Sequence, residues 1–230
     1  TGAEFVVIKT SQGFMLGQTG TVQDFRDWEQ RDRGRPGIDP KSGMLPPKLA
    51  RIMVNLSGAR PQTSTLLDPF CGSGTILMEA AMVGFKHVIG TDISQQAVEQ
   101  SKKNLSWIKK PALIFVAPAE KLALEAVSDV IVTEPYLGPP LRGGEGVHKI
   151  NEIVATLVPL YAKSFANLFT QLKSGGRAVV AFPFFTKTKT SGFAAVRAKL
   201  EAIGFRVESI NLYARQEQYV GREIVILSKP

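Results

Sequence analysis

The stretch Leu66-Leu67-Asp68-Pro69-Phe70-Cys71-Gly72-Ser73-Gly74-Thr75 decides the fold of this chain, because an apolar strand there runs into a carboxylate and then into a glycine-broken turn. A helix is expected directly after the turn, over residues 75–83. Gly72 and Gly74 carry no side chain where a ligand would approach the backbone, and the first N–H groups of the helix are unpaired donors. The pattern predicts that a small molecule binds at this turn.

The chemistry of the turn favours a cationic or zwitterionic ligand over a phosphate. The turn does not end in Gly-Lys-Ser/Thr as a P-loop does, and Asp68 would repel an anion. A second apolar strand follows, Val88-Ile89-Gly90-Thr91-Asp92, and it also ends in an acid. An acid at this spacing accepts hydrogen bonds from a ribose in doubly wound sheets. Because Asp-x-x-x-Gly-x-Gly differs from the dinucleotide pattern Gly-x-Gly-x-x-Gly, we expect S-adenosylmethionine as the ligand in preference to NAD.

Three segments resemble the catalytic domain of THUMP-associated RNA methyltransferases, and most closely the family that methylates the exocyclic amine of tRNA guanosine-10. They are Gly43-Met44-Leu45-Pro46-Pro47-Lys48-Leu49-Ala50, the turn motif from Asp68 to Thr75, and Thr133-Glu134-Pro135-Tyr136, which departs from the family pattern. The resemblance covers about residues 23–230. It implies an α/β fold of the Rossmann-like class I methyltransferase type: a three-layer sandwich around a mostly parallel seven-stranded sheet with one reversed edge strand.

Strands and helices alternate along the chain, as a three-layer α/β domain requires. Helices are predicted over 46–57, 75–83, 95–107, 148–172 and 193–203, and strands over 66–68, 88–92, 112–117, 129–133, 177–182, 205–213 and 223–228. Gly175 and Gly176 are expected to end the long helix, and the strand over 112–117 is expected to be buried on both faces. The helix that begins at Pro46 is expected to bury Leu49, Ile52, Met53 and Leu56.

The chain of 230 residues, 44% of them apolar, predicts one main domain. We assign residues 44–230 to this methyltransferase domain, and residues 1–43 to an N-terminal hairpin over 4–19 and a linker, as the end of an upstream RNA-binding part. Residues 31–37 are too rich in glycine, proline and charge for regular structure. One cysteine and two histidines allow neither an internal disulfide nor an ordinary structural zinc site, so we expect no metal and a cytoplasmic location. No apolar run approaches the roughly 20 residues needed to cross a bilayer.

The resemblance implies how the donor would be held. The turn motif would wrap its methionine part, Asp92 would hold the ribose hydroxyls, and Ile93 would lie against the adenine. Many relatives carry an Asp before an alanine after the third strand, but this chain has Ala117-Pro118-Ala119-Glu120, so either Glu120 or backbone groups would take that role. The predicted donor-binding residues are Asp68, Pro69, Phe70, Cys71, Gly72, Gly74, Thr75, Asp92, Ile93, Ala119, Glu120 and Pro46.

The predicted catalytic residues are Glu134, Pro135 and Tyr136. In amino-directed methyltransferases an Asp or Asn and a proline carbonyl accept hydrogen bonds from the target amine, and an aromatic ring stacks on the flipped base. Two registers are open: Glu134 replaces the acid, or Thr133 occupies its place and Tyr136 the aromatic position. We favour Glu134, because Ile131-Val132-Thr133 matches the strand that leads into the acid. A tight turn packed beneath the donor in an inactive relative is the alternative.

A formal net charge of +8 favours a polyanionic partner. We predict that tRNA or another structured RNA binds to a basic face formed by Arg31, Arg33 and Arg35 together with Lys187 and Lys189. The two lysines follow the fifth strand and would overlook the catalytic edge. Three functions stay open: methylation of an exocyclic base amine in RNA, most favourably guanosine N2 of tRNA; methylation of DNA; and donor binding by a catalytically silent RNA-binding module.

Overall fold

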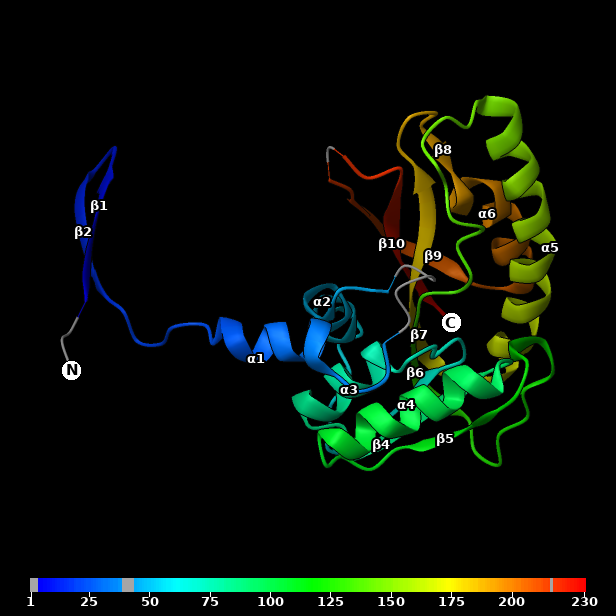
Figure 1. Ribbon diagram of the computed structural model, residues 1–230, viewed down its shortest axis with the longest axis horizontal. Helices are drawn as coiled ribbons and strands as arrows, with labels where there is room; N and C mark the ends of the chain where they lie inside the picture. Colours follow the sequence, from blue (N-terminus) through cyan, green and yellow to red (C-terminus); the bar gives the residue numbers. More distant parts are fainter. Residues whose placement is uncertain (1–3, 39–43, 216) are drawn as a thin grey trace. The chain divides into compact units, whose positions relative to one another are not determined.

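The computed structural model describes residues 4–38, 44–215 and 217–230, drawn in Figure 1. The chain divides into two compact units, Thr1–Gly34 and Arg35–Pro230. The second unit therefore begins upstream of residue 44, where the sequence places the boundary. The assignment of residues 1–43 to the end of an RNA-binding part stays a prediction, and Gly43 of the upstream motif lies outside the described residues.

The first unit consists of a hairpin and a short helix. Strands β1 (Phe5–Thr10) and β2 (Gly13–Gln18) pair antiparallel, which confirms the predicted hairpin. Helix α1 (Phe25–Glu29) begins after Asp24, whose carboxylate accepts from the N–H groups of Arg26 and Asp27. The chain then continues as a π-helical turn, Gln30–Gly34, where the composition predicted irregular structure.

The second unit is built on one sheet with the strand order β5-β4-β3-β6-β7-β10-β9. The strands are β3 (Thr65–Asp68), β4 (His87–Asp92), β5 (Leu113–Val116), β6 (Ser128–Thr133), β7 (Leu172–Phe185), β9 (Arg206–Tyr213) and β10 (Val220–Ser228), and the short β8 (Thr190–Ser191) pairs with β7. The pairs from β5 to β7 are all parallel, whereas β10 is antiparallel to both β7 and β9. The predicted mostly parallel sheet is confirmed, and the short β8 gives it eight strands where seven were predicted.

The reversed strand does not lie at the edge, as predicted, but one place in from it, because β10 lies between β7 and β9. The residues of β10 and β9 explain why β10 takes the inner position. Ile224, Val225 and Leu227 form an apolar run that is buried on both faces of the sheet. Most of β9, by contrast, is exposed, as suits an edge strand.

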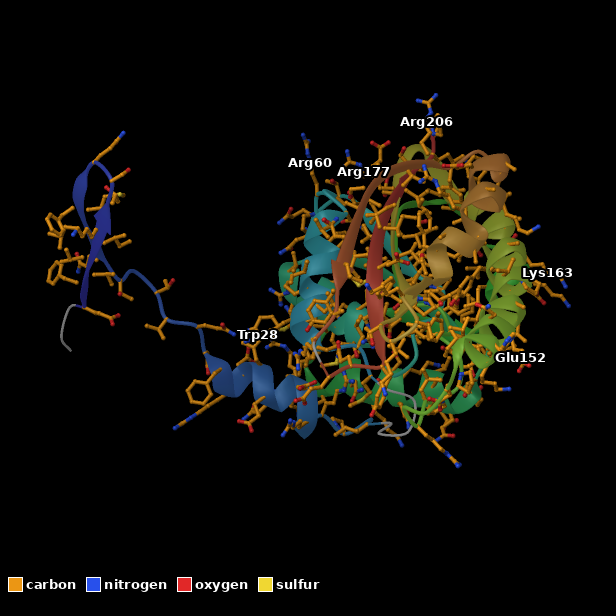
Figure 2. All side chains as sticks on the ribbon, turned by 90° about the horizontal axis from the view of Figure 1, so that it is seen from above. Trp28, Arg60, Glu152, Lys163, Arg177 and Arg206 are labelled. Atoms are coloured by element: carbon orange, nitrogen blue, oxygen red, sulfur yellow. The ribbon has the colours of Figure 1, made fainter. Side chains whose placement is uncertain are left out.

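Helices cover both faces of the sheet and give the predicted three layers (Figure 1). One face packs against α2 (Pro47–Leu56), α3 (Thr75–Val83) and α4 (Gln95–Trp107), and the other against α5 (Val147–Gln171) and α6 (Gly192–Ile203). Helix α5 is long and apolar enough to cross a membrane by length and composition. Its apolar side, however, is buried on the sheet at Tyr161 and Phe165, and its outer face carries Glu152 and Lys163, which point away from the body in Figure 2. It is therefore a core helix.

Three local predictions are wrong. Strand β5 is an edge strand with Leu113 and Val116 exposed, because an apolar run does not reveal that the sheet stops there. Helix α5 ends at Gln171 and β7 begins at Leu172, so the two glycines expected to end the helix lie inside the strand. In α2 the side chain of Ile52 is exposed, since the buried side of that helix is formed by Leu49, Ala50, Met53 and Val54.

Candidate active site

Three acids end three neighbouring parallel strands and meet at one edge of the sheet. Asp68 is the last residue of β3, Asp92 is the last of β4, and Glu134 directly follows β6, in the order β4-β3-β6. Burial raises the pKa of Asp68, and the negative charges of Asp92 and Glu134 raise it further. The structure thus brings the predicted donor and catalytic motifs together at the carboxyl ends of the strands.

The turn between β3 and α3 owes its shape to its two glycines. Gly72 and Gly74 have left-handed φ angles of 52° and 83°. A Cβ atom on Gly72 would meet no atom within 4 Å, so its backbone faces open space. A Cβ atom on Gly74 would collide with Ser101 of α4. Gly72 therefore has open space beside its backbone, whereas Gly74 allows the turn to pack against the neighbouring helix.

Asp92 is tied to the turn by its side chain. Its Oδ2 accepts from the N–H of Gly72 at 2.9 Å, and its Oδ1 accepts from the N–H of Ser94 at 2.9 Å. Each oxygen keeps a second lone pair, so the carboxylate can still accept from hydroxyl groups. Ile93 beside it is 75% exposed, an apolar side chain that nothing covers among the described residues. The pair suits a ribose attached to a flat apolar base.

Asp68 is almost completely buried, with 1% of its surface exposed. Burial raises its pKa to about 7, although hydrogen bonds from the hydroxyl of Thr133 at 2.7 Å and the N–H of Phe70 at 3.3 Å act in the opposite direction. A buried acid with these neighbours favours a cationic group beside it, because a nearby positive charge would offset the free-energy cost of burying the ionised carboxylate.

Arg35 lies at the turn motif, which corrects the prediction that it is part of an exposed basic face; its contact with RNA stays a prediction. Its side chain is buried, and its guanidinium donates to the hydroxyls of Thr75 at 2.7 Å and Ser73 at 3.3 Å. The same group donates to the sulfur of Met44 at 3.0 Å, which brings the upstream motif beside the turn. The sequence pattern predicts that an arginine in a charged segment is exposed to solvent, and only its tertiary contacts show that it is buried.

Asn104 of α4 joins the segment after Arg35 to the turn. Its Oδ1 accepts from the N–H of Gly37 at 2.7 Å, and its Nδ2 donates to the carbonyls of Gly37 and Ser73, both at 2.8 Å. Sequence reasoning missed this residue. The available signal was its place between Ser101 and Leu105 on the buried side of the helix, where an amide needs partners.

Glu134 forms an ion pair with Arg222 of β10. The Nε of Arg222 donates to Oε1 at 2.5 Å and Nη2 donates to Oε2 at 3.5 Å. Burial raises the pKa of Glu134, and the charge and hydrogen bonds of Arg222 oppose that rise. Sequence reasoning missed Arg222, because nothing in the sequence near residue 222 indicates that its side chain contacts Glu134.

The other two residues of the catalytic motif are placed differently. Pro135 is buried, whereas Tyr136 is 55% exposed at the edge of the site. The carbonyl of Tyr136 accepts from the hydroxyl of Tyr161 at 2.6 Å, and burial raises the pKa of Tyr161, so this hydroxyl stays protonated. The turn that carries Glu134 is thus held from α5 as well as from β10.

The remaining predicted donor residues have mixed surroundings. The carbonyl of Ala119 accepts from Asn167 at 2.9 Å, Glu120 is exposed, and Pro46 is the residue before α2. Cys71 is buried, and burial raises the pKa of its thiol, which disfavours the reactive thiolate form. Over residues 4–38, 44–215 and 217–230, no three His, Cys, Asp or Glu side chains gather as a metal site would need.

The predicted RNA contacts are only partly available. Lys187 is exposed, donates to the carbonyl of Gly143 at 2.6 Å and lies 4.8 Å from the ring centre of Tyr219. Lys189 and Arg33 are exposed. Within the N-terminal unit, Arg31 pairs with Asp27 and lies over Trp28, so it already has partners.

Comparison with known proteins identifies relatives of this chain. The model of the family UPF0020, described as an RMKL-like methyltransferase domain, matches residues 37–203. The tRNA (guanine(10)-N2)-dimethyltransferase of Methanothermobacter thermautotrophicus is 35% identical over 159 residues, which is 68% of this chain and 43% of that protein. The enzyme of the same name from Pyrococcus abyssi is 32% identical over 235 residues, or 96% of this chain and 61% of that protein.

A solved structure shares the fold. TrmN from Thermus thermophilus superposes with a TM-score of 0.63 at 21% identity, over 99% of this chain and 60% of that one. This chain accordingly spans between 43% and 61% of the length of the two curated relatives. The family match covers the turn motif, the three acids and most of the sheet. The chain therefore belongs to the UPF0020 family, as an RMKL-like methyltransferase domain.

Proposed function

We propose that this chain transfers a methyl group from S-adenosylmethionine to the N2 amine of guanine in tRNA. The observation that carries the proposal is the convergence of Asp68, Asp92 and Glu134 on one edge of the sheet, beside the open backbone of Gly72. The names of the two archaeal relatives, both tRNA guanine N2 dimethyltransferases, supply the target atom. This chain spans only part of the length of those two enzymes, so their activity is a proposal for it.

The donor-binding residues fit the proposed cofactor. When bound, S-adenosylmethionine supplies a methyl group activated by a positively charged sulfur. Asp68, whose burial favours a nearby cation, and the turn from Gly72 to Thr75 would hold the methionine part. Asp92 would accept from the ribose hydroxyls, and the exposed side chain of Ile93 would cover the adenine.

The acceptor-binding residues follow β6. The carboxylate of Glu134 and the carbonyl of Pro135 would accept hydrogen bonds from the guanine amine and so orient its lone pair. Tyr136, exposed at the edge, would stack on the base. The hydroxyl of Thr133 donates to Asp68 and is fully buried, which supports Glu134 as the acceptor over Thr133.

One observation favours a second candidate, a donor-binding module that is catalytically silent. The carboxylate of Glu134 is already paired with Arg222, and such a pair would also be expected of a structural residue. The two candidates agree on donor binding and differ on transfer. The proposed compartment is the cytoplasm and the proposed partner is tRNA.

The experiment that tests the proposal is a transfer assay with three substrates in parallel. The chain is incubated with methyl-labelled donor and with unmodified tRNA, rRNA or DNA, and the nucleosides are analysed by mass spectrometry. We expect N2-methylguanosine or N2-dimethylguanosine in tRNA alone. Label in DNA would favour the DNA enzyme, and donor binding without label in any nucleic acid would favour the silent module.

A further inference from the structure

The ion pair between Glu134 and Arg222 crosses a strand. Glu134 follows β6 and Arg222 lies in β10, and β7 separates the two. Side chains alternate between the two faces of a sheet, so Arg222 lies on the face of Ile224, and Glu134 continues the face of Val132. Both apolar residues belong to the core beneath α2 and α3, together with Ala181 of β7. On β7, Arg222 lies opposite Pro183, and the small Ala181 lies on the same face of the strand.

The pair is enclosed by protein. Only 8% of the Arg222 side chain and 14% of the Glu134 side chain are exposed. A buried ion pair gains little over apolar residues of similar size, because desolvation offsets most of the attraction. Stability alone is therefore a weak reason for the arrangement, and its position at the acceptor motif points to a role in positioning.

The carboxylate keeps capacity for another partner. Arg222 uses Nε and Nη2, one for each oxygen of Glu134. An ionised carboxylate offers about four acceptor positions, so about two remain for donors on the side away from the arginine. Glutamate is one methylene longer than the aspartate or asparagine expected in this motif, and its extra rotatable bond has to be fixed before the carboxylate can orient a base.

We propose that Arg222 is a positioning residue, which fixes the Glu134 side chain and keeps its carboxylate ionised so that it can accept hydrogen bonds from the target amine. This inference rests on the proposed function and extends it to a residue of β10. The groups that face Glu134 are Arg222 from β10, Asp68 from β3 and Tyr161 from α5. Among these only Arg222 carries a positive charge.

The loss of Arg222 has a defined electrostatic consequence. Burial raises the pKa of Glu134, and Arg222 opposes this rise. Without the arginine, burial would act unopposed. Glu134 would then take up a proton at a higher pH, and a protonated carboxyl is a poorer acceptor. As the pH is lowered, a variant without Arg222 should therefore lose methyl-transfer activity at a higher pH than the parent does.

The test compares Arg222→Met, Arg222→Lys and a matched control, Arg197→Met, which removes an arginine from the exposed Arg197–Glu201 pair of α6. Transfer to tRNA is measured between pH 5 and 9 with kcat and KM separated. Independently, the carboxyl carbon of Glu134 is titrated by NMR in protein labelled with 13C-glutamate, with Glu134→Gln as the assignment control. The NMR titration needs neither donor nor RNA.

For Arg222→Met we expect kcat to fall by about 10²-fold with both KM values little changed, as for a misplaced catalytic group. The acid limb of the pH–rate profile and the midpoint of the Glu134 titration should both move to higher pH, because the arginine no longer opposes the effect of burial. Arg222→Lys should keep the limb near that of the parent, since it keeps the charge, and should still lose kcat, since it cannot make the two-point contact. If Arg222→Met does not fold, Arg222→Lys decides: parental kcat in that variant overturns the inference.

An unchanged pH profile and an unchanged Glu134 titration in folded Arg222→Met would also overturn the inference. Failure of the proposed function gives a different pattern. The parent would then methylate no nucleic acid at any pH. The titration of Glu134 would nevertheless differ between the parent and Arg222→Met. In that case the ion pair is structural and the positioning role is rejected with the function.

Discussion

Asp68 is the residue whose surroundings have the clearest measurable effect. Its pKa rises from an ordinary 3.8 to about 7 in the folded protein, chiefly through burial. Between these two values the unfolded chain carries an ionised Asp68 while the folded protein still holds the proton. Stability contributed at this position is therefore lost as the pH rises through that range, by about 4 kcal/mol when the loss is complete.

Asp68→Asn should consequently stabilise the protein without donor at pH 8, because asparagine keeps an oxygen for Thr133 but carries no buried charge. The advantage should shrink as the pH falls toward 4, which thermal unfolding at a series of pH values would measure. Asp129→Asn is the control: burial would raise the pKa of Asp129, but Lys173 and the N–H of Thr65 lower it, so that variant should be destabilised near neutral pH. Parallel pH curves for the parent and Asp68→Asn would contradict the prediction.

Asp92→Ala should weaken donor binding by about 1 to 3 kcal/mol, the value of a hydrogen bond to a charged group. Calorimetric titration of S-adenosylmethionine measures it. Glu99→Ala, on the exposed side of α4, is the matched control and should bind like the parent. Equal affinity in Asp92→Ala and the parent would remove this residue from the donor site.

The residues of the site differ in how far the sequence predicts them. Asp68, Gly72 and Asp92 are fixed by local patterns, since a strand end and a tight turn constrain the residue types there. Arg35 was misplaced and Arg222 was missed, because both act through contacts with residues 40 and 88 positions away in the sequence. No local pattern records such a partner.

At the scale of elements, Asn104 is the connection between α4, the turn and the segment around Gly37. Asn104→Ala would leave the N–H of Gly37 and the carbonyls of Gly37 and Ser73 without this partner. Each buried polar group left unpaired costs about 1 to 3 kcal/mol. Urea unfolding should show a loss of at least that size, and donor affinity should fall because the turn is less fixed.

Asn211→Ala provides the comparison, since that asparagine of β9 is exposed and should be replaced at little cost. If Asn104→Ala were as stable as Asn211→Ala, the connection would contribute nothing to the fold.

The elements themselves were largely predictable. Helices α3 and α4 begin and end as predicted, because glycines bound the first and Ser94 caps the second. What the sequence did not reveal is order within the sheet. An apolar run predicts a buried strand equally well for β5 and β6, yet β5 lies at an edge. Neighbour choice among strands depends on long-range packing, and so the inner position of β10 was also missed.

At the scale of the whole molecule, positive charge is spread over both ends of the strands. Lys187 and Lys189 follow β7 at the carboxyl ends, whereas Arg60, Arg177 and Arg206 lie at the amino ends. Figure 2 shows Arg60 and Arg206 pointing away from the body of the unit. A tRNA that reaches Glu134 should contact the first group and not the second.

The double variant Lys187→Ala, Lys189→Ala should therefore bind tRNA more weakly and depend less on salt. Removing one lysine–phosphate interaction reduces the slope of log affinity against log salt by about 0.7 for single strands and 0.9 for duplex regions. Titrations at several salt concentrations measure the slope. The control variant Arg60→Ala, Arg206→Ala removes the same charge from the opposite end and should keep the parental slope. Equal slopes in the two variants would reject the carboxyl-end face.

The place of β10 has a consequence for synthesis. It follows every other strand of the sheet in sequence, yet it is inserted between β7 and β9 and carries Arg222. Domains acquire structure from the N-terminal side while the ribosome is still adding residues. A nascent chain that has emerged only as far as β7 already contains Asp68, Asp92 and Glu134, but the partner of Glu134 has yet to be made. On our proposals, the growing polypeptide would gain the donor-binding residues first. It would gain the ability to orient a base only after β10 has been synthesised and has joined the sheet.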